Sequence, residues 1–357
     1  MKKIRVNLAR YSYDVLIGAG LLTLVGLFLK EKGYAGKAVV ITDPNVKSRY
    51  GEVLERSLTK NGFKVTTLVV PAGEDQKSLD NAVRLYEQLT DAYAERSTLI
   101  VALGGGVIGD LTGFVAATYL RGVPFVQLPT TLLAQVDSSV GGKVAVDHER
   151  LKNKIGAFHQ PRLVIADTDT LKTLPKAELA NGLAEAIKTA AVRGKEFFVY
   201  LEQNVEKLRA LDISALEEAV YQCVSIKAEI VEKDERDAGL RNILNFGHTI
   251  GHAIESVSHF GVRHGEAVAV GMVATARISN RMGLLSYSEV DRLITLVEKA
   301  GLPARMPDLD TSAILKAMRH DKKVESGQVR FVLLKEIGDV IMSDEVSPVL
   351  VAEVLAI

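Results

Sequence analysis

The first half of the chain alternates short apolar runs with longer amphipathic ones. The short runs are rich in β-branched residues and predict strands at four places, Lys37–Thr42, Phe63–Val70, Thr98–Leu103 and Phe125–Leu128. Between them, apolar residues at helical spacing predict helices over Tyr50–Lys60 and Ser78–Asp91, and a third helix is expected to open near Asp110. Strands that alternate with helices imply an α/β domain with a parallel, Rossmann-like sheet and helices on both faces.

The pattern changes after about Asp167, where long amphipathic stretches take over. They predict helices over six ranges, Pro175–Arg193, Glu196–Arg209, Ile213–Asp234, Ile243–Val257, Gly265–Met282 and Tyr287–Ala300. The second half is therefore expected to be a mostly α-helical domain. We place the domains at 1–168 and 169–357, with the boundary near Ala166–Thr173.

Composition narrows the class of protein. A chain of 357 residues is long for one core and favours two domains. Lys+Arg and Asp+Glu both total 44, so the balance of charge gives no reason to expect nucleic acid or a membrane surface as partner. The basic N-terminal stretch lacks the apolar core of a signal peptide and is expected to form a strand. The single cysteine, Cys223, excludes an internal disulfide and fits a cytoplasmic protein.

A glycine-rich loop follows the strand at Thr98–Leu103. Residues Gly104–Asp110 match G-x-G-x-x-G, a pattern in which backbone N–H groups and a helix N-terminus receive a pyrophosphate. The match is incomplete, because no acidic residue ends the next strand, so a tight turn without a ligand is an equal alternative. Asp43, at the end of an earlier strand, is a better candidate for a ribose hydroxyl, and the turn at Pro71–Glu74 could line the same crevice.

The sequence also indicates a metal site. Four of the seven histidines lie between positions 248 and 264, and His248 and His252 share one face of a predicted helix. Imidazole is the commonest protein ligand for zinc-like metals. Spacing alone does not say which of the four would bind, although His259 falls in a probable loop. The remaining three, His148, His159 and His320, are assigned structural or surface roles.

Glu185 lies on another predicted helix and could supply a third, oxygen ligand. Three protein ligands and one open position are the usual catalytic arrangement for zinc. The alternative is a plain surface ion pair between Glu185 and Lys188, which are three residues apart and so share a face.

Basic residues recur beside glycines, asparagines and the edges of these motifs. Together they would suit a small polyanion, gripped by arginine forks and lysine point charges. Asn153 and Asn245 could add hydrogen bonds to hydroxyl groups. The basic residues are Arg121, Lys143, Lys152, Lys188, Lys227, Arg241 and the pair Lys322–Lys323.

Six segments in this order resemble the 3-dehydroquinate synthase family over nearly the whole chain. They are LGGGVIGDLTGFVAATYLRGV, QLPTTLLAQVDSSVGGKVAVD, LKNKIGAFHQP, NGLAEAIKTA, DERDAGLRNILNFGHTIGHAIE and RHGEAVAVGM. The resemblance implies an NAD- and metal-dependent lyase that converts 3-deoxy-D-arabino-heptulosonate 7-phosphate to 3-dehydroquinate and phosphate. It also implies a homodimer and a small sugar phosphate as substrate.

The resemblance assigns site residues as well. The metal, Zn²⁺ or Co²⁺, would be held by Glu185, His248 and His264, and His252 would handle protons. NAD would contact Asp43, Asn45, Ala72, Gly73, Glu74, Asp75, Gln76, Lys77, Gly105, Gly106, Val107, Ile108, Gly109, Asp110, Thr130, Thr131, Asp137, Lys143, Lys152, Thr170, Leu171, Lys172 and Thr173. The substrate would contact Arg121, Lys143, Lys152, Asn153, Lys188, Lys227, Arg241, Asn245, His252 and Lys322. Catalytic roles would fall to His252, Lys152, Asn153, Arg241, Asp237 and Lys188.

One position departs from the family pattern. The family usually has D-E-R-E before G-L-R, and here the last residue is Asp237, a shorter carboxylate. If that position shuttles protons, the change puts its role in doubt.

Three other functions are alternatives. A metal- and NAD-dependent polyol dehydrogenase would share the two-domain plan, but a neutral polyol does not need so many cations. A sister cyclase acting on another sugar phosphate would differ at few residues. A non-catalytic NAD- or metal-binding protein would leave the complete set of site residues unexplained.

Overall fold

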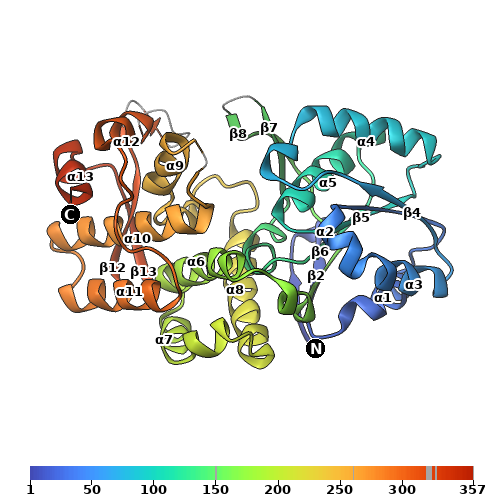
Figure 1. Ribbon diagram of the computed structural model, residues 1–357, viewed down its shortest axis with the longest axis horizontal. Coiled ribbons are helices and arrows are strands. Elements are labelled where there is room, and N and C mark those ends of the chain that lie inside the picture. The colour runs from blue at the N-terminus through green and yellow to red at the C-terminus, as the bar shows by residue number, and fades with distance from the viewer. Residues whose placement is uncertain (149–150, 260, 319–323, 326–327, 357) are drawn as a thin grey trace. The chain divides into compact units, whose positions relative to one another are not determined.

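The computed structural model describes residues 1–148, 151–259, 261–318, 324–325 and 328–356 (Figure 1). The chain forms two compact units. The first unit comprises Met1–Leu174 and Lys227–Arg236, and the second comprises Pro175–Ile226 and Asp237–Ile357. In the described part of the chain, no helix is both long enough and apolar enough to cross a membrane.

The first unit is built on one seven-stranded sheet with the order β1-β2-β9-β6-β5-β3-β4. Its strands are β1 (Lys2–Val6), β2 (Tyr13–Gly18), β3 (Lys37–Thr42), β4 (Lys64–Val69), β5 (Leu99–Gly104), β6 (Phe125–Pro129) and β9 (Leu163–Asp167). All neighbours pair in parallel except β1 and β2, which are antiparallel. From β3 onward the chain order across the sheet reverses between β3 and β5, and such a switch point opens a crevice at the carboxyl ends of the strands.

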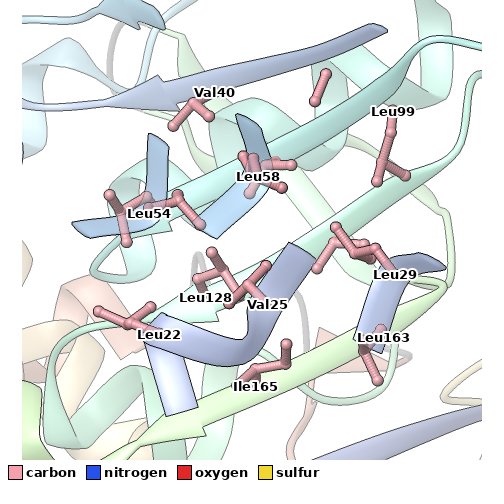
Figure 2. Close-up of a cluster of buried hydrophobic side chains, with 14 of the residues drawn as sticks. Leu22, Val25, Leu29, Val40, Leu54, Leu58, Leu99, Leu128, Leu163 and Ile165 are labelled. Carbon is pink, nitrogen blue, oxygen red and sulfur yellow. The ribbon is translucent and has the colours of Figure 1, made fainter. Parts of the chain in front are cut away.

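Helices cover both faces of this sheet: α1 (Val25–Glu31) and α3 (Glu52–Lys60) on one, α4 (Leu79–Asp91) and α5 (Gly106–Thr118) on the other. Alternate residues of a strand point to opposite faces. Val40 accordingly packs with the α1 and α3 side, and Val39 and Ile41 pack with the α4 and α5 side. Figure 2 shows the first of these cores, with helical side chains facing strand side chains: Leu22, Val25, Leu29, Leu54 and Leu58 opposite Val40, Leu99, Leu128, Leu163 and Ile165.

The second unit is mostly helical. Its helices are α6 (Lys176–Arg193), α7 (Lys195–Arg209), α9 (His248–Val257), α10 (His264–Arg281), α11 (Tyr287–Lys299), α12 (Thr311–Met318) and α13 (Pro348–Leu355). A further helix, α8 (Ile213–Lys233), begins in this unit and contributes its last residues to the first. Two short antiparallel hairpins complete the unit, β10 (Val324–Glu325) with β11 (Gln328–Val329), and β12 (Phe331–Glu336) with β13 (Asp339–Ser343).

The predicted fold class, a parallel Rossmann-like sheet followed by a mostly helical part, is confirmed. Two predicted helix starts are wrong. Helix α5 begins at Gly106 rather than near Asp110, because Gly109 N–H already bonds to the carbonyl of Gly105 at 3.0 Å. Helix α9 begins at His248 rather than Ile243. The preceding 3-10 helix ends at Asn245, where Phe246 becomes extended (ψ 128°), and Gly247 then takes a left-handed conformation (φ 77°) just before α9.

The pattern also missed several strands. The hairpin of β7 (Lys143–His148) and β8 (Leu151–Phe158) was not predicted, nor were the strands of the second unit. The predicted domain limits, 1–168 and 169–357, stay a prediction. One boundary in the sequence does not describe the two compact units, because Lys227–Arg236 belongs to the first unit although Pro175–Ile226, which precedes it, belongs to the second.

Candidate functional site

Glu185 and Lys188 lie on one face of α6 and are both buried. Small and apolar residues surround them in the sequence, and the helix has no solvent-exposed face at this point. Glu185 is 0% exposed and Lys188 is 2% exposed, and Lys188 Nζ lies 2.5 Å from Glu185 Oε2. The alternative of a surface ion pair is therefore wrong. A buried ion pair of this kind is costly to desolvate and is seldom kept for stability alone.

Helices α9 and α10 approach each other closely because glycines line their contact. A Cβ atom on Gly251 would lie 3.1 Å from the carbonyl oxygen of Ala267, and one on Gly271 would collide with the backbone of Gly247. This close approach brings together two histidines from different helices, His248 at the start of α9 and His264 at the start of α10. Their ring centroids are 5.4 Å apart.

Glu185, His248 and His264 converge on one point. Glu185 Oε1 lies 3.5 Å from His248 Nε2 and 3.3 Å from His264 Nε2. One ligand atom from each residue lies within 4.8 Å of the others. Ligands bound about 2.0–2.1 Å from a tetrahedral zinc ion lie about 3.3 Å apart, so the spacing suits such an ion.

The protonation of these groups also fits a cation. Burial lowers the pKa of His248 well below its ordinary value, so that imidazole is neutral. Burial would raise the pKa of Glu185, but the Lys188 ammonium holds it well below the ordinary value. Burial would likewise lower the pKa of His264, but hydrogen bonds to Glu185 and Glu255 raise it to about 10. Without a metal, His264 therefore carries a proton that faces the Glu185 carboxylate. A divalent cation could take the place of this proton and bind two neutral imidazoles and one carboxylate.

The surroundings of the Glu185 carboxylate also fit a cation. Its Oε2 faces the Lys188 ammonium, whereas its Oε1 faces the Nε2 atoms of both His248 and His264. One oxygen and two nitrogen ligands form a set that catalytic zinc sites use. The residues present therefore fit a divalent metal.

His252 lies beside this group. Its ring centroid is 5.2 Å from that of His248 and 6.3 Å from that of His264. With Glu255 and His264 it forms a second set of potential ligand atoms within 4.8 Å. His252 is exposed and His248 is buried, so the two helical neighbours have different surroundings. His259, expected to lie in a loop, follows the end of α9 in a turn.

Sequence reasoning missed two residues at this site. Glu255, 3% exposed, accepts from His264 Nδ1 at 3.2 Å. Asn181 Oδ1 accepts a short hydrogen bond from the backbone N–H of Gly265, and this bond ties α6 to the first turn of α10. Both lie inside quoted motifs, as the Glu of HAIE and the Asn of NGLAEAIK. A polar residue on an otherwise apolar helix was the signal available.

In the first unit, the residues predicted to bind NAD follow the carboxyl ends of parallel strands. Asp43 and Asn45 follow β3, Ala72–Lys77 follow β4, Gly105–Asp110 follow β5, Thr130 and Thr131 follow β6, and Thr170–Thr173 follow β9. The register sets Thr42 beside Leu103 and Gly104 beside Pro129, so three of these segments are neighbours. This edge of the sheet is where open α/β folds bind ligands.

The packing of the glycine-rich loop bears on the choice between its two predicted roles, a tight turn and a pyrophosphate site. A Cβ atom on Gly105 would lie 2.9 Å from Thr131 Cγ2, and one on Gly109 would lie 2.7 Å from Gln127 Oε1. Packing therefore requires these glycines with or without a ligand. Yet the N-terminus of α5 opens at the switch point, and among the described residues no side chain caps it. Such a helix end suits a pyrophosphate.

A buried lysine connects several of the predicted residues. Lys77 Nζ donates to Asp110 Oδ2 at 2.6 Å and, more closely, to Asn153 Oδ1. Burial would lower the pKa of Lys77, but Asp110 raises it above the ordinary value. Lys152 pairs with Glu74 at 3.2 Å. The turn after β4, the first turn of α5 and the β7–β8 hairpin are thus held to one another.

Lys227 and Asp137 form a further ion pair, with the buried Lys227 Nζ 2.5 Å from Oδ1 of the partly exposed Asp137. Close to Asp137, Gln135 is fully buried and was missed from sequence. Its Nε2 donates to the carbonyls of Pro129 and Asp167 and to Thr170 Oγ1. It thereby fixes the segments after β6 and β9 against each other.

The remaining predicted residues are more dispersed. Lys143 begins β7 and is exposed, whereas Arg241 is 4% exposed in the 3-10 helix Leu240–Asn245. Asn245 Nδ2 donates to Asn242 at 3.3 Å, and Asp237 has a positive φ of 59°. Arg121 lies between α5 and β6, at the amino edge of the sheet and away from the strand ends described above. Lys322, with Lys323 and His320, lies outside the described residues.

Two family models match the chain. The model of the 3-dehydroquinate synthase N-terminal part covers residues 67–181, and that of the C-terminal part covers residues 182–324. A 3-dehydroquinate synthase of Dehalococcoides mccartyi (strain CBDB1) is 50% identical over 346 residues, which are 97% of this chain and 96% of the relative.

Solved structures agree with this assignment. A 2-epi-5-epi-valiolone synthase from Streptomyces hygroscopicus, with NAD⁺ and Zn²⁺ bound, has a TM-score of 0.91 at 27% identity, covering 98% of this chain and 97% of its own. A 2-deoxy-scyllo-inosose synthase complexed with carbaglucose-6-phosphate, NAD⁺ and Co²⁺ has a TM-score of 0.91 at 28% identity, covering 99% of both. With about half of its residues shared with a relative of nearly equal length, the chain belongs to the 3-dehydroquinate synthase family.

Proposed function

We propose that this chain converts 3-deoxy-D-arabino-heptulosonate 7-phosphate to 3-dehydroquinate and inorganic phosphate. The observation that supports it most is that one carboxylate, from Glu185, and two imidazoles, from His248 and His264, converge on one point. The substrate loses the elements of phosphoric acid and closes a carbocycle, with no net oxidation. The enzyme is thus a lyase that serves aromatic amino acid biosynthesis by the shikimate pathway.

NAD and a divalent metal, Zn²⁺ or Co²⁺, are the cofactors of the proposal. The metal would be held by Glu185, His248 and His264, and NAD by the segments that follow the carboxyl ends of the parallel strands. When bound, NAD would take up and return a hydride at C5, and the metal would polarise the hydroxyl groups at C4 and C5. The uncapped start of α5 supports the pyrophosphate position, and Asp43 supports the ribose position.

The chain's own cations would bind the substrate's two anionic ends. Lys188 lies in an ion pair with Glu185 next to the proposed metal ligands, and we assign it a contact with one anionic end of the substrate. Arg241 offers a fork suited to a carboxylate or phosphate, with Asn245 in the same 3-10 helix. Lys143, Lys152, Asn153, Lys227 and Lys322 complete the proposed contacts. Arg121, at the amino edge of the sheet, is proposed on the family resemblance alone. Fixing both ends can remove roughly 7–11 kcal/mol of barrier when the geometry is tight.

Proton transfers are assigned to His252 and, less directly, to Asp237. His252 is exposed and adjoins the metal group, so its imidazole can exchange protons with bound substrate. Asp237 is shorter than the usual Glu, so its reach is reduced. The substrate's own phosphate can act as base in the elimination, and no separate protein base is assigned to that step.

The sister cyclases are the nearest alternative. The solved 2-epi-5-epi-valiolone and 2-deoxy-scyllo-inosose synthases are 27% and 28% identical to this chain, against 50% for the dehydroquinate synthase relative. A polyol dehydrogenase is not favoured, because the relative that is 50% identical over nearly the full chain is a 3-dehydroquinate synthase.

A substrate panel tests the proposal. Purified protein with NAD and Zn²⁺ or Co²⁺ would be given the heptulosonate phosphate or glucose 6-phosphate, and released phosphate would be measured. We expect phosphate from the first at least a hundredfold faster, equimolar with 3-dehydroquinate, and loss of activity on chelation. Faster release from glucose 6-phosphate would assign the chain to a sister cyclase.

The proposal includes a homodimer in the cytoplasm. The family resemblance supports the dimer, and the single buried Cys223 is compatible with a reducing compartment. Light scattering of the purified protein would test the dimer, with a mass of one chain, 38.7 kDa, as the contradicting result.

A further inference from the structure

Glu255 is a buried carboxylate that the proposed reaction does not use. It lies on α9, is 3% exposed, and faces His264 across the contact between α9 and α10. Its Oε2 lies 3.2 Å from His264 Nδ1. The other nitrogen of the same ring, Nε2, lies 3.3 Å from Glu185 Oε1. The imidazole of His264 is therefore held from both sides, with Glu255 on the side away from Glu185.

His248 shows the same arrangement with a different acceptor. Its Nδ1 lies 3.1 Å from the backbone carbonyl oxygen of Phe246, and its Nε2 lies 3.5 Å from Glu185 Oε1. An oxygen that accepts a hydrogen bond from one ring nitrogen keeps the proton there and leaves the lone pair on the other nitrogen. Both rings are thus anchored at Nδ1 so that Nε2 turns toward Glu185.

We propose that Glu255 is a positioning residue for the metal centre, which accepts a hydrogen bond from His264 Nδ1 and so presents Nε2 as the ligand. This inference rests on the proposed function, because it presupposes a metal at Glu185, His248 and His264. A carboxylate behind a histidine ligand fixes its ring and increases its basicity. Because α9 also carries His248, Glu255 links the orientation of one proposed ligand to the helix that carries the other.

A competing arrangement makes Glu255 a ligand itself. His252, Glu255 and His264 also offer three ligand atoms within 4.8 Å. The two arrangements share His264 and differ in what they require of the others. If Glu255 orients, an amide in its place still accepts the hydrogen bond, and His252 is dispensable for binding. If Glu255 ligates, the amide fails and His252 is needed.

The test measures Zn²⁺ and Co²⁺ affinity by chelator competition in the full-length protein, without substrate. E255M keeps the side-chain volume and removes the acceptor, and we expect it to weaken both affinities about 10–100-fold. E255Q keeps the acceptor, and we expect a loss of less than about tenfold. The Co²⁺ absorption spectrum of E255M at saturating metal should also shift. The matched control is E266Q, two residues from His264, whose amide can still accept from the backbone N–H of Arg263 as Glu266 does.

Each outcome of these measurements supports or overturns the positioning role of Glu255. Wild-type affinity in E255M, with an unchanged Co²⁺ spectrum, would overturn the positioning role. A loss in E255Q or H252A as large as in H264A would make Glu255 a ligand and overturn it as well. If the wild-type protein binds neither metal, the metal site of the proposed function fails, which is a separate result. Thermal unfolding of each metal-free variant checks the fold, and E255A replaces E255M if that variant does not fold.

Discussion

Lys188 and Glu185 form an ion pair on α6 whose two side chains are 2% and 1% exposed. The pair lies one turn apart on a helix, where such pairs are ordinarily wet and weak. Here the Lys188 ammonium keeps the Glu185 carboxylate ionised in the interior. An ionised oxygen is what a divalent metal needs, so this ion pair supports the proposed role of Glu185 as a metal ligand.

Replacing Lys188 should therefore lower the unfolding free energy more in the metal-free protein than in the metal-bound protein. K188M leaves the buried Glu185 carboxylate without its nearest cation, and we expect the metal-free protein to lose about 3 kcal/mol of unfolding free energy. Bound Zn²⁺ would replace that charge and reduce the loss. Urea unfolding with and without Zn²⁺ measures the difference. K195M, which breaks an exposed pair with Glu336, should leave stability nearly unchanged with or without Zn²⁺. Equal losses in K188M with and without Zn²⁺ would contradict this account.

Substitutions of the proposed metal ligands should affect the protein differently from substitution of His252, their neighbour on α9. E185A and H264A should abolish Zn²⁺ binding, whereas H252A should keep the metal and mainly lower kcat. Metal content after dialysis, measured beside steady-state kinetics, distinguishes binding from turnover. If H252A loses metal as completely as H264A, the ligand assignment is incorrect.

The spacing of α9 and α10 should also control the site. G271A would place a methyl group against the backbone of Gly247, so we expect a loss of about 3 kcal/mol in unfolding free energy and weaker Zn²⁺ binding. G51A is the matched control, since its Cβ would meet a flexible Lys47 side chain at 3.1 Å and helix propensity favours alanine by about 1 kcal/mol. Undiminished metal affinity in a folded G271A protein would show that the helix contact does not set the ligand geometry.

Acid stability should depend on Asp14. Burial would raise the pKa of Asp14, but hydrogen bonds from Lys32 and Arg5 outweigh it and lower that pKa to about 2, against an ordinary 3.8. A lowered folded-state pKa stabilises above pH 3.8, and this contribution is lost as the pH falls through 2. Wild type should exceed D14N by about 1–2 kcal/mol at pH 6, after allowance for solvent screening, and the difference should shrink toward pH 2. A difference independent of pH would indicate a packing effect instead.

The alternating first half was predictable chiefly because β3, β5 and β6 are buried on both faces and are therefore continuous apolar runs in the sequence. Strand β3 was predicted with its observed bounds, Lys37–Thr42. The β7–β8 hairpin was missed because glycines and charges break its pattern, and its packing against α5 is a tertiary effect. The start of α9 depended on the left-handed Gly247, which periodicity over Ile243–Val257 does not register.

Residue types and the family resemblance were enough to propose the members of the candidate site, and the structure brings Glu185, His248 and His264 together. Spacing alone would have paired His248 with His252, since they share a helical face. The burial of Lys188 and the place of Glu255 behind His264 depend on how separate helices pack, which sequence spacing does not encode.

The proposed reaction uses NAD without consuming it. The most direct measurement follows phosphate release and absorbance at the wavelength of reduced NAD in the same reaction with the heptulosonate phosphate. The account predicts many equivalents of phosphate per enzyme, with reduced NAD never exceeding the enzyme concentration. Reduced NAD that accumulates in proportion to turnover, without phosphate release, would contradict it and identify a dehydrogenase.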